Sequence, residues 1–246
     1  MRMKPKLFSR PTIGHPFSKG LVGSWLMNEN DGKIIQDSSG NNNEGQRYGT
    51  GTIWVAGKVW NAINFNGTND TIRLKDTARL KITGKITLSC WVKVHFFPVN
   101  INTWSYFISK GYDGSKEGYQ LRLTGGGAKT YLTTGSYGAS EGNNITEIDI
   151  AGLNWSVGEW KNIVSSYDGT YWNLYYNGIL VSSTARAYGA LPSNAYFRMG
   201  SFDGSGTASR FLNGVMYDVK VFNRTLTASE IAYLYKNSFC MFEEDM

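Results

Sequence analysis

Apolar and polar residues alternate along most of this chain, in short runs that are separated by turn residues. Residues 86–94 (ITLSCWVKV) show the pattern best, because Leu88, Cys90 and Val92 share one face while Trp91 lies on the other. Such alternation predicts half-buried β-strands. Comparable runs occur at 21–27, 62–66, 71–74, 106–110, 119–124, 129–134 and 196–202.

Residues 159–184 carry the clearest hairpin signals. They read as three strands joined by two short turns, Asp168-Gly169 and Asn177-Gly178. These residue pairs tolerate the positive φ angles that type I′ hairpins require. The segment therefore predicts three antiparallel neighbours.

A last strand is expected over 211–223. There Val215, Tyr217, Val219 and Val221 alternate with polar or exposed positions. Because successive strand residues point to opposite faces, the four apolar residues are predicted to share one face.

One helix is expected near the C-terminus, over 228–236. Thr227 and Glu230 have the spacing of a capping box, and they precede the apolar positions Ile231 and Leu234. About a dozen short strands with antiparallel turns form two packed sheets. The predicted fold is all-β: a two-sheet antiparallel jelly-roll sandwich with one short C-terminal helix.

Seven short motifs follow one another between residues 21 and 235. They are GLVGSWLMNENDG, QDSSGNNNEG, INFNGTNDTIRL, ITLSCWVK, YFISKG, GEWKNIVSSYDGTYWNLYYNGILV and GVMYDVKVFNRTLTASEIAYLY. In this order they resemble the laminin-G-like, concanavalin A-like lectin/glucanase jelly-roll family. The resemblance implies a lectin-like binding domain. A basic arm before GLVGSW is similar to what tailed-phage structural proteins of this family carry.

Positive charge is concentrated at the N-terminus. Residues 1–28 hold five basic residues and no acidic one, whereas the rest of the chain has 20 Lys and Arg against 19 Asp and Glu. This pattern is a poor match to a nucleic-acid binder. It favours a basic extended arm over 1–20 that docks on an acidic protein surface, followed by a jelly-roll domain over 21–238 and an acidic tail over 239–246. The expected docking residues are Arg2, Lys4, Lys6, Arg10 and Lys19.

Apolar runs are too short for a membrane helix, which needs roughly 18 residues, so membrane insertion is not expected. The N-terminus lacks the apolar stretch of a secretory signal peptide. Virion proteins leave the cell by lysis and need no such signal. The expected location is therefore a virion surface, or the extracellular space after lysis.

The chain contains only part of one known catalytic motif. Retaining glucanases of this type place three acids at alternate positions of one strand, and Glu147-Ile148-Asp149 begins that pattern. The third acid is missing, because Ala151 follows in its place. The only histidines, His15 and His95, lie in the arm and after a strand. No enzymatic activity is expected.

One structural calcium ion is a possible cofactor. The resemblance implies a Ca²⁺ that ties the early Asx-rich loop to the last strand, through hard oxygen ligands. Asp37, Asn42 and Asp218 occupy the matching motifs, and Glu29 is an additional candidate ligand. The alternative is that Asp37 caps a turn and Asp218 pairs with a basic residue.

Sugar binding needs aromatic faces and nearby polar groups. Trp104, Tyr112 and Tyr137 lie in or beside loops, and Asp113 adjoins one of them. Loop aromatics can equally anchor a protein partner. These four residues are the predicted carbohydrate site.

Two classes of function follow. The favoured one is a non-catalytic virion-surface protein, for capsid decoration or adhesion, that docks on other subunits through its arm and forms oligomers or assemblies. The alternative is a carbohydrate-binding module for adhesion or receptor recognition. A third hypothesis, the remotest of the three, is that the chain is a glycoside hydrolase.

Overall fold

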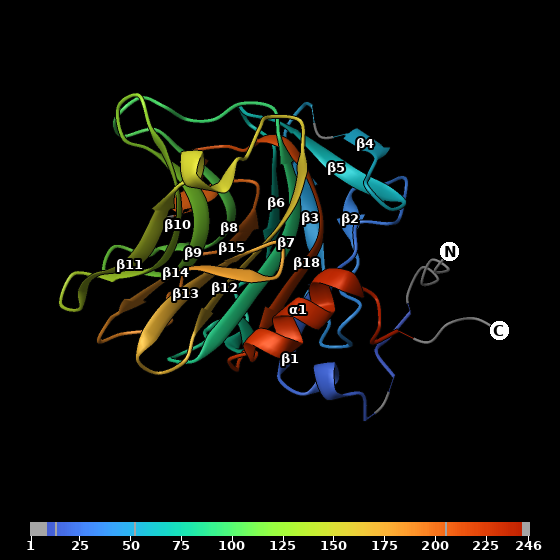
Figure 1. Ribbon diagram of the computed structural model, residues 1–246. Helices are drawn as coiled ribbons and strands as arrows, with labels where there is room; N and C mark the ends of the chain where they lie inside the picture. Colours follow the sequence, from blue (N-terminus) through green and yellow to red (C-terminus); the bar gives the residue numbers. More distant parts are fainter. Residues whose placement is uncertain (1–8, 13, 52, 205, 243–246) are drawn as a thin grey trace.

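Two curved β-sheets pack face to face, and outside them lies one α-helix, the only one in the part of the chain that the structure describes (Figure 1). The computed structural model describes residues 9–12, 14–51, 53–204 and 206–242. The helix α1 spans Ala228–Lys236, as predicted. The sheets make an all-β jelly-roll sandwich, which confirms the predicted fold class.

The first sheet has eight strands, in the order β14-β13-β12-β7-β18-β5-β4 with β1 beside β18, and all its pairings are antiparallel. The two predicted turns at Asp168-Gly169 and Asn177-Gly178 join three of its strands. The strands are β1 (Leu21–Trp25), β4 (Ile53–Ala56), β5 (Asn61–Asn66), β7 (Ile86–Val94), β12 (Trp160–Tyr167), β13 (Tyr171–Tyr176), β14 (Ile179–Ala185) and β18 (Asn213–Phe222).

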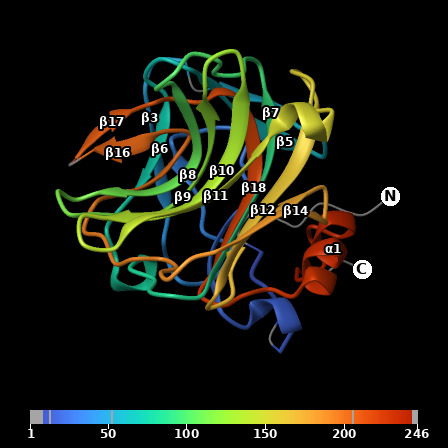
Figure 2. The same cartoon turned by 60° about the vertical axis from the view of Figure 1, so that its left-hand side comes forward.

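The second sheet has ten strands, in the order β11-β10-β9-β8-β15-β6-β3-β2, with the hairpin β16–β17 attached to β8. This hairpin projects beside β3 and β6 in Figure 2. The strands are β2 (Ile34–Ile35), β3 (Gly45–Tyr48), β6 (Thr71–Leu74), β8 (Trp104–Tyr112), β9 (Lys116–Gly125), β10 (Thr130–Gly138), β11 (Gly142–Asp149), β15 (Phe197–Met199), β16 (Phe202–Gly204) and β17 (Thr207–Ser209). Three short 3₁₀ helices are η1 (Pro16–Ser18), η2 (Ala78–Leu80) and η3 (Ile150–Leu153).

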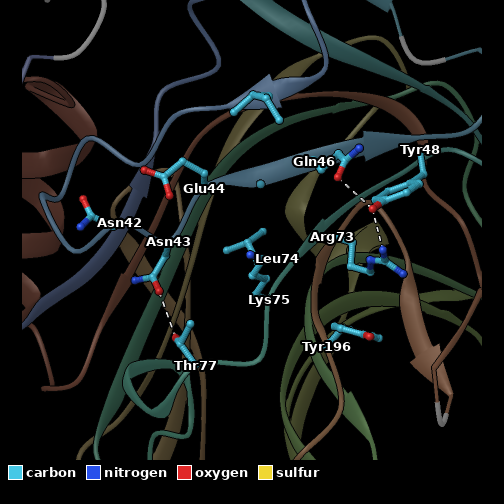
Figure 3. Close-up of a pocket in the computed structure, with 12 residues that line it drawn as sticks. Asn42, Asn43, Glu44, Gln46, Tyr48, Arg73, Leu74, Lys75, Thr77 and Tyr196 are labelled. Atoms are coloured by element: carbon cyan, nitrogen blue, oxygen red, sulfur yellow. Dashed lines mark hydrogen bonds between the residues drawn. The ribbon is translucent and has the colours of Figure 1, made fainter.

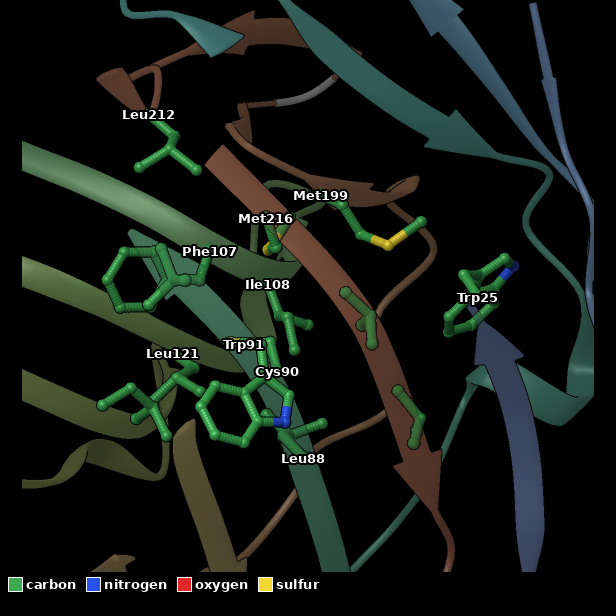
Figure 4. Packing of buried hydrophobic residues seen from close by; sticks show 14 of the residues in the cluster. Trp25, Leu88, Cys90, Trp91, Phe107, Ile108, Leu121, Met199, Leu212 and Met216 are labelled. Carbon is green, nitrogen blue, oxygen red and sulfur yellow. The ribbon is translucent and has the colours of Figure 1, made fainter. Parts of the chain in front are cut away.

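The main hydrophobic core fills the space between the two sheets (Figure 4). Leu88 and Cys90 point into it from β7, as the alternation predicts, and both are fully buried. Burial raises the pKa of the Cys90 thiol well above its usual range, so the thiol stays protonated and inert. Trp25 is also fully buried, and its indole Nε1 donates to the Asn43 carbonyl at 2.8 Å. The core therefore uses the inward-facing residues of both sheets.

A β-bulge at Asp218 changes the phase of β18. Three steps along β18, from Tyr217 to Lys220, lie opposite two steps along β7, from Trp91 to Ser89. Asp218 has a φ of +53°, a left-handed value that Asp tolerates better than most residues. Val219 therefore faces the core, whereas Tyr217 lies beside Trp91 on the outer face. The prediction that Val215, Tyr217, Val219 and Val221 share one face was wrong, because the bulge interrupts the alternation.

A second hydrophobic cluster joins the N-terminal segment to the C-terminal helix. Phe17, in η1, is buried and stacks on Tyr233 of α1 with 6.0 Å between ring centroids. The Thr12 N–H donates to the Met241 carbonyl at 2.8 Å. The described part of the predicted arm thus packs against the domain. Its basic residues Arg10 and Lys19 are exposed.

Arg2, Lys4 and Lys6 lie outside the described residues, as does the tail over 243–246. The division of the chain at residues 20 and 238 stays a prediction. In the described ranges, no helix has both the length and the apolar character to cross a membrane.

Candidate functional site

A pocket of about 450 Å³ opens at one end of the ten-stranded sheet (Figure 3). Strands β3 and β6 form its floor, and the segment 42–44 and Tyr196 form its sides. A volume of this size suits a small polar ligand. The lining residues are Ile34, Asn42, Asn43, Glu44, Gly45, Gln46, Tyr48, Arg73, Leu74, Lys75, Thr77 and Tyr196.

Strand alternation places the polar side chains in the pocket. Gln46 of β3 pairs with Arg73 of β6. The neighbours of Arg73, Ile72 and Leu74, are buried in the core, so Arg73 points to the outer face. Gly45 has no side chain, and an added Cβ would lie 2.6 Å from the Ile72 side chain. The two strands can therefore approach closely while they present Gln46 and Arg73 to the ligand side.

Arg73 lies between two tyrosine rings. Its Cζ atom is 4.4 Å from the ring centroid of Tyr48 and 4.8 Å from that of Tyr196. The guanidinium Nη2 donates to the Tyr48 hydroxyl at 2.5 Å, and that hydroxyl donates to Gln46 Oε1 at 3.0 Å (Figure 3). Cation–π contact and hydrogen bonding thus fix the positions of two rings and one amide.

A buried carboxylate holds Tyr196 in place. Asp203, in the hairpin β16–β17, is fully buried. Its Oδ2 atom accepts the Tyr196 backbone N–H at 3.1 Å, and its Oδ1 atom accepts Arg198 Nε at 2.6 Å. The hairpin therefore supports one wall of the pocket.

The other wall is the segment 42–44. Asn43 is buried and structural, because its Nδ2 donates to the Val22 carbonyl at 2.9 Å and its Oδ1 accepts the Thr77 hydroxyl at 3.0 Å. Asn42, at a φ of +59°, and Glu44 are exposed on either side of it. Among the described residues, neither of these two side chains has a hydrogen-bond partner. Both are available to a ligand.

The predicted carbohydrate residues divide into two places. Tyr112 and Tyr137 come together, with ring centroids 6.3 Å apart. Trp104 starts β8 while Tyr112 ends it, and the Trp104 ring stacks under Arg210 at 4.4 Å instead. The structure therefore brings together two of the three predicted aromatics, and neither of them lines the pocket.

Asp113 organises a turn rather than facing a ligand. Its Oδ1 atom accepts the backbone N–H groups of Ser115 and Lys116, and its Oδ2 atom accepts that of Asn194 at 2.9 Å. Partial burial acts to raise the pKa of Asp113, but these N–H donors outweigh it and lower the pKa to about 2.

The predicted calcium ligands do not gather around one point. Both Asp37 oxygens accept backbone N–H groups, from Ser24 at 3.0 Å and from Asn43 at 2.9 Å. Glu29 Oε1 accepts the Gln36 N–H at 2.8 Å. Asn42 lines the pocket described above. In the ranges that the structure covers, no three His, Cys, Asp or Glu side chains are grouped to hold a metal ion.

Asp218, the fourth predicted calcium ligand, is paired with a lysine. Its carboxylate is buried and accepts a hydrogen bond from the ammonium of Lys220. The Lys220 side chain is also buried, with 2% of its surface exposed. Burial raises the pKa of Asp218 against the opposing effect of Lys220. A lysine at this carboxylate repels a cation. These residues therefore do not fit a calcium site, and the ion-pair alternative describes Asp218.

The incomplete acid motif lies on the edge strand β11. Asp149 caps η3, accepting the Ala151 N–H at 3.0 Å, and its other oxygen pairs with Lys129 at 3.1 Å. Glu147 Oε2 accepts only a long 3.5 Å bond from Thr133. Asp149 is thus engaged by η3 and Lys129, and Ala151 stands where the third acid of the motif would be.

Sequence reasoning missed Tyr48, Arg73 and Tyr196, together with Glu44 and Gln46. The available signal was weak: Gln46 and Tyr48 alternate along β3, and Arg73 interrupts the apolar run of β6. Tyr196 is more than 100 residues away in the chain, so its place beside Arg73 follows only from the pairing of β15 with β6.

Solved structures with the same fold include several binding domains. Domain 4 of AbnA, a GH43 extracellular arabinanase from Geobacillus stearothermophilus solved with arabinotriose, is 22% identical with a TM-score of 0.63, covering 87% of this chain and 98% of its own. The binding domain of Paraclostridial Mosquitocidal Protein 1 is 18% identical with a TM-score of 0.67, covering 90% and 53%. The ligand-binding domain of botulinum neurotoxin serotype D, solved with N-acetylneuraminic acid, is 15% identical with a TM-score of 0.67, covering 91% and 52%. This chain thus spans about half the length of the two toxin domains.

A search of curated protein sequences gives no match to this chain. A family model does match, over residues 66–232, which is more than half of the chain. This range contains β6 and β15 of the pocket, and it ends within α1. The chain belongs to the concanavalin A-like lectin/glucanases superfamily.

Proposed function

We propose that this chain is a non-catalytic glycan-binding domain whose ligand occupies the pocket between β3, β6 and the segment 42–44. The observation that carries the proposal is Arg73, held between Tyr48 and Tyr196 in a pocket that Asn42 and Glu44 also line, and the side chains of these two have no hydrogen-bond partner among the described residues. Arabinotriose and N-acetylneuraminic acid in two structures of the same fold support a sugar as the ligand class.

Sugar hydroxyls match this set of groups. The carboxylate of Glu44 accepts two hydroxyl protons, and the amide of Asn42 both donates and accepts. The Tyr48 and Tyr196 rings offer apolar surface to the C–H groups of a sugar ring. The charged lining residues are Glu44, Lys75 and Arg73. Because Arg73 is engaged by the two tyrosine rings, Glu44 and Lys75 are the charged groups left to a ligand, one of each sign, and the pocket favours a neutral, hydroxyl-rich ring.

Binding without hydrolysis is the expected activity. Asp149 is occupied by η3 and Lys129, and the strand has no third acid. Calcium has no part in the proposal, since Asp218 is paired with Lys220.

A glycan microarray with three proteins tests the proposal. Wild type is expected to bind a defined set of neutral glycans, and Tyr196→Ala is expected to lose them. Tyr137→Ala is the matched control, because Tyr137 is also an accessible tyrosine of this sheet, 38% exposed. Loss in Tyr137→Ala with full binding by Tyr196→Ala would move the site to the Tyr112–Tyr137 pair. No binding by wild type would contradict the proposal.

The charge of the N-terminus supports a second proposal: that the domain is displayed on a virion surface or a similar assembly, outside the cell. Five basic residues lie in the first 28 without an acid. Phe17 and Thr12 attach the described part of this segment to the domain, so deletion of residues 1–8 leaves that attachment intact. Light scattering in low salt is expected to show assemblies that the deletion weakens. A monomer in both proteins would contradict this role.

A further inference from the structure

A second cavity, of about 720 Å³, lies on the outer face of the eight-stranded sheet. The turn at 57–60 between β4 and β5 forms one side, and the end of α1 with residues 237–239 forms the other. The floor is Trp91 and Tyr217. The lining residues are Lys58, Val59, Trp60, Trp91, Tyr217, Tyr235, Lys236, Asn237, Ser238 and Phe239.

Five of the ten lining residues are aromatic, and several of their rings are nearly parallel. Trp91 stacks with Tyr217 at 6.0 Å and 17°, and with Tyr235 at 5.6 Å and 21°. The Trp91 Nε1 atom donates to Ser238 Oγ at 3.0 Å, which fixes the segment after α1 onto the sheet. Trp60 contacts Phe239, with ring centroids 4.4 Å apart.

Trp60 occupies a conformation that aromatic residues rarely adopt. Its φ is +67°, in the left-handed region that favours glycine. The turn is closed by the Gly57 N–H, which donates to the Trp60 carbonyl at 2.7 Å. A tryptophan held in this backbone places its indole at the mouth of the cavity. Strained residues of this kind cluster at ligand-binding positions.

The rim of the cavity is positively charged. Lys58 Nζ lies 4.0 Å from the Trp91 ring centroid. Lys236 ends α1 and is exposed. In the described ranges, neither ammonium forms an ion pair. Desolvation and the nearby Lys161 lower the pKa of Lys58. Lys161 itself pairs with Glu159 at 3.0 Å, so that carboxylate is already engaged.

We propose that this cavity is a second ligand site, which takes an acidic saccharide: a sugar ring that carries a carboxylate. The flat C–H face of the ring stacks on Trp60, Tyr235 and Phe239, and the carboxylate pairs with Lys58 and Lys236. An acidic peptide offers the same charge, but it lacks a rigid apolar face to match the ring walls. The inference rests on the proposed function only for its ligand class, because the residues are different from those of the first pocket.

Calorimetric titration with two matched probes tests this site. One probe is a glucuronate-containing disaccharide, and the other is the same disaccharide with glucose in place of glucuronate. Wild type is expected to bind the glucuronate probe. The double variant Lys58→Gln/Lys236→Gln is expected to bind it at least tenfold more weakly, with no change for the glucose probe. Tyr196→Ala serves as the matched variant of the first pocket, and should bind the glucuronate probe normally.

A second variant tests the contribution of the aromatic rings to binding in this cavity. Trp60→Gly suits the positive φ, so it removes the indole without adding strain, and it is expected to weaken glucuronate binding. Loss of glucuronate binding in Tyr196→Ala, with the lysine variant unaffected, would place the acidic sugar in the first pocket and overturn the second site alone. Competition by a poly-glutamate peptide at equal strength would overturn the saccharide class. Absence of binding by any glycan to any variant would instead contradict the proposed function.

Discussion

At the scale of single residues, the first pocket depends on one arginine. Arg73 contacts both tyrosine rings and hydrogen bonds to the Tyr48 hydroxyl, which in turn bonds to Gln46, so removal of Arg73 releases both rings and loosens the Gln46 amide. A cation–π contact and a hydrogen bond each contribute about 1 kcal/mol, and roughly 1.4 kcal/mol is a tenfold change in affinity.

Arg73→Ala is therefore expected to weaken glycan binding by about tenfold or more. Titration calorimetry with the strongest neutral glycan measures the change. Arg79→Ala is the control, because Arg79 is exposed in the nearby helix η2. Equal affinities for the two variants would show that Arg73 does not organise the site.

Lys220→Met is expected to destabilise the protein strongly. It leaves the Asp218 carboxyl buried without its partner, and removal of one member of a buried ion pair costs about 3–5 kcal/mol. Urea unfolding measures the loss. Asp218→Asn combined with Lys220→Met is expected to recover much of it, since Asn tolerates the positive φ and carries no charge. A single variant as stable as the double one would contradict the ion-pair role.

The Asp113→Asn variant is expected to lose less stability than wild type as the pH falls. The pKa of Asp113 falls from its ordinary 3.8 to about 2 on folding. A carboxyl with a lowered folded pKa stabilises the fold above its unfolded pKa, and that stability is lost as the pH falls from 3.8 toward 2. Thermal melting across this window should show a shallower decline for the variant than for wild type. Asp31→Asn, an exposed control, should decline as wild type does.

At the scale of elements, the sequence predicted the elements with a regular pattern and failed where a bulge or an exposed sheet edge disturbs that pattern. The strand at 86–94 and the helix at 228–236 were predicted with their observed bounds, because their periodicity and capping residues are undisturbed. The prediction of which β18 residues share one face was wrong, because the bulge at Asp218 shifts the alternation by one residue. The edge strand β11, GNNITEID, was not predicted as a strand, since its exposed side leaves it mostly polar.

The sequence did not predict the pocket residues, for a related reason. Outward polar positions such as Gln46 and Arg73 look like any solvated strand face in the sequence. Only the order β15-β6-β3 brings Tyr196 to them. The predicted aromatics, by contrast, were chosen for their loop positions, and Trp104 and Tyr112 lie at opposite ends of one strand.

Thr227→Ala tests the helix that closes the second cluster. The Thr227 hydroxyl accepts the Glu230 N–H at 3.2 Å, and Glu230 Oε2 accepts the Thr227 N–H at 2.7 Å. Loss of this cap is expected to cost about 1 kcal/mol. Ser229→Ala, in the same exposed first turn, should cost less, and chemical unfolding of both variants gives the comparison. Equal losses would mean that the capping box adds no stability.

At the scale of the whole molecule, the two sheets present different surfaces. The ten-stranded sheet carries the hydroxyl-matching pocket, and the eight-stranded sheet carries the lysine-rimmed aromatic cavity. If both proposals hold, the two faces of one domain would contact two kinds of sugar unit. The described part of the N-terminal segment packs against α1 through Phe17 and Tyr233.

Melting temperature is expected to be the same with excess calcium and with chelator. Asp37 is occupied by backbone N–H groups and Asp218 by Lys220, so the described residues offer no linked cation site. Differential scanning calorimetry in the two conditions makes the comparison. A clear rise with calcium would restore the predicted metal site.

The central claim is that a neutral glycan occupies the pocket between β3, β6 and the segment 42–44. Backbone amide chemical shifts, recorded during titration with the strongest neutral glycan, test it most directly. Saturable shifts concentrated in residues 42–48, 73–75 and 196 are the predicted result. Shifts concentrated instead at 104–113 and 137, with residues 42–48 unchanged, would contradict the claim.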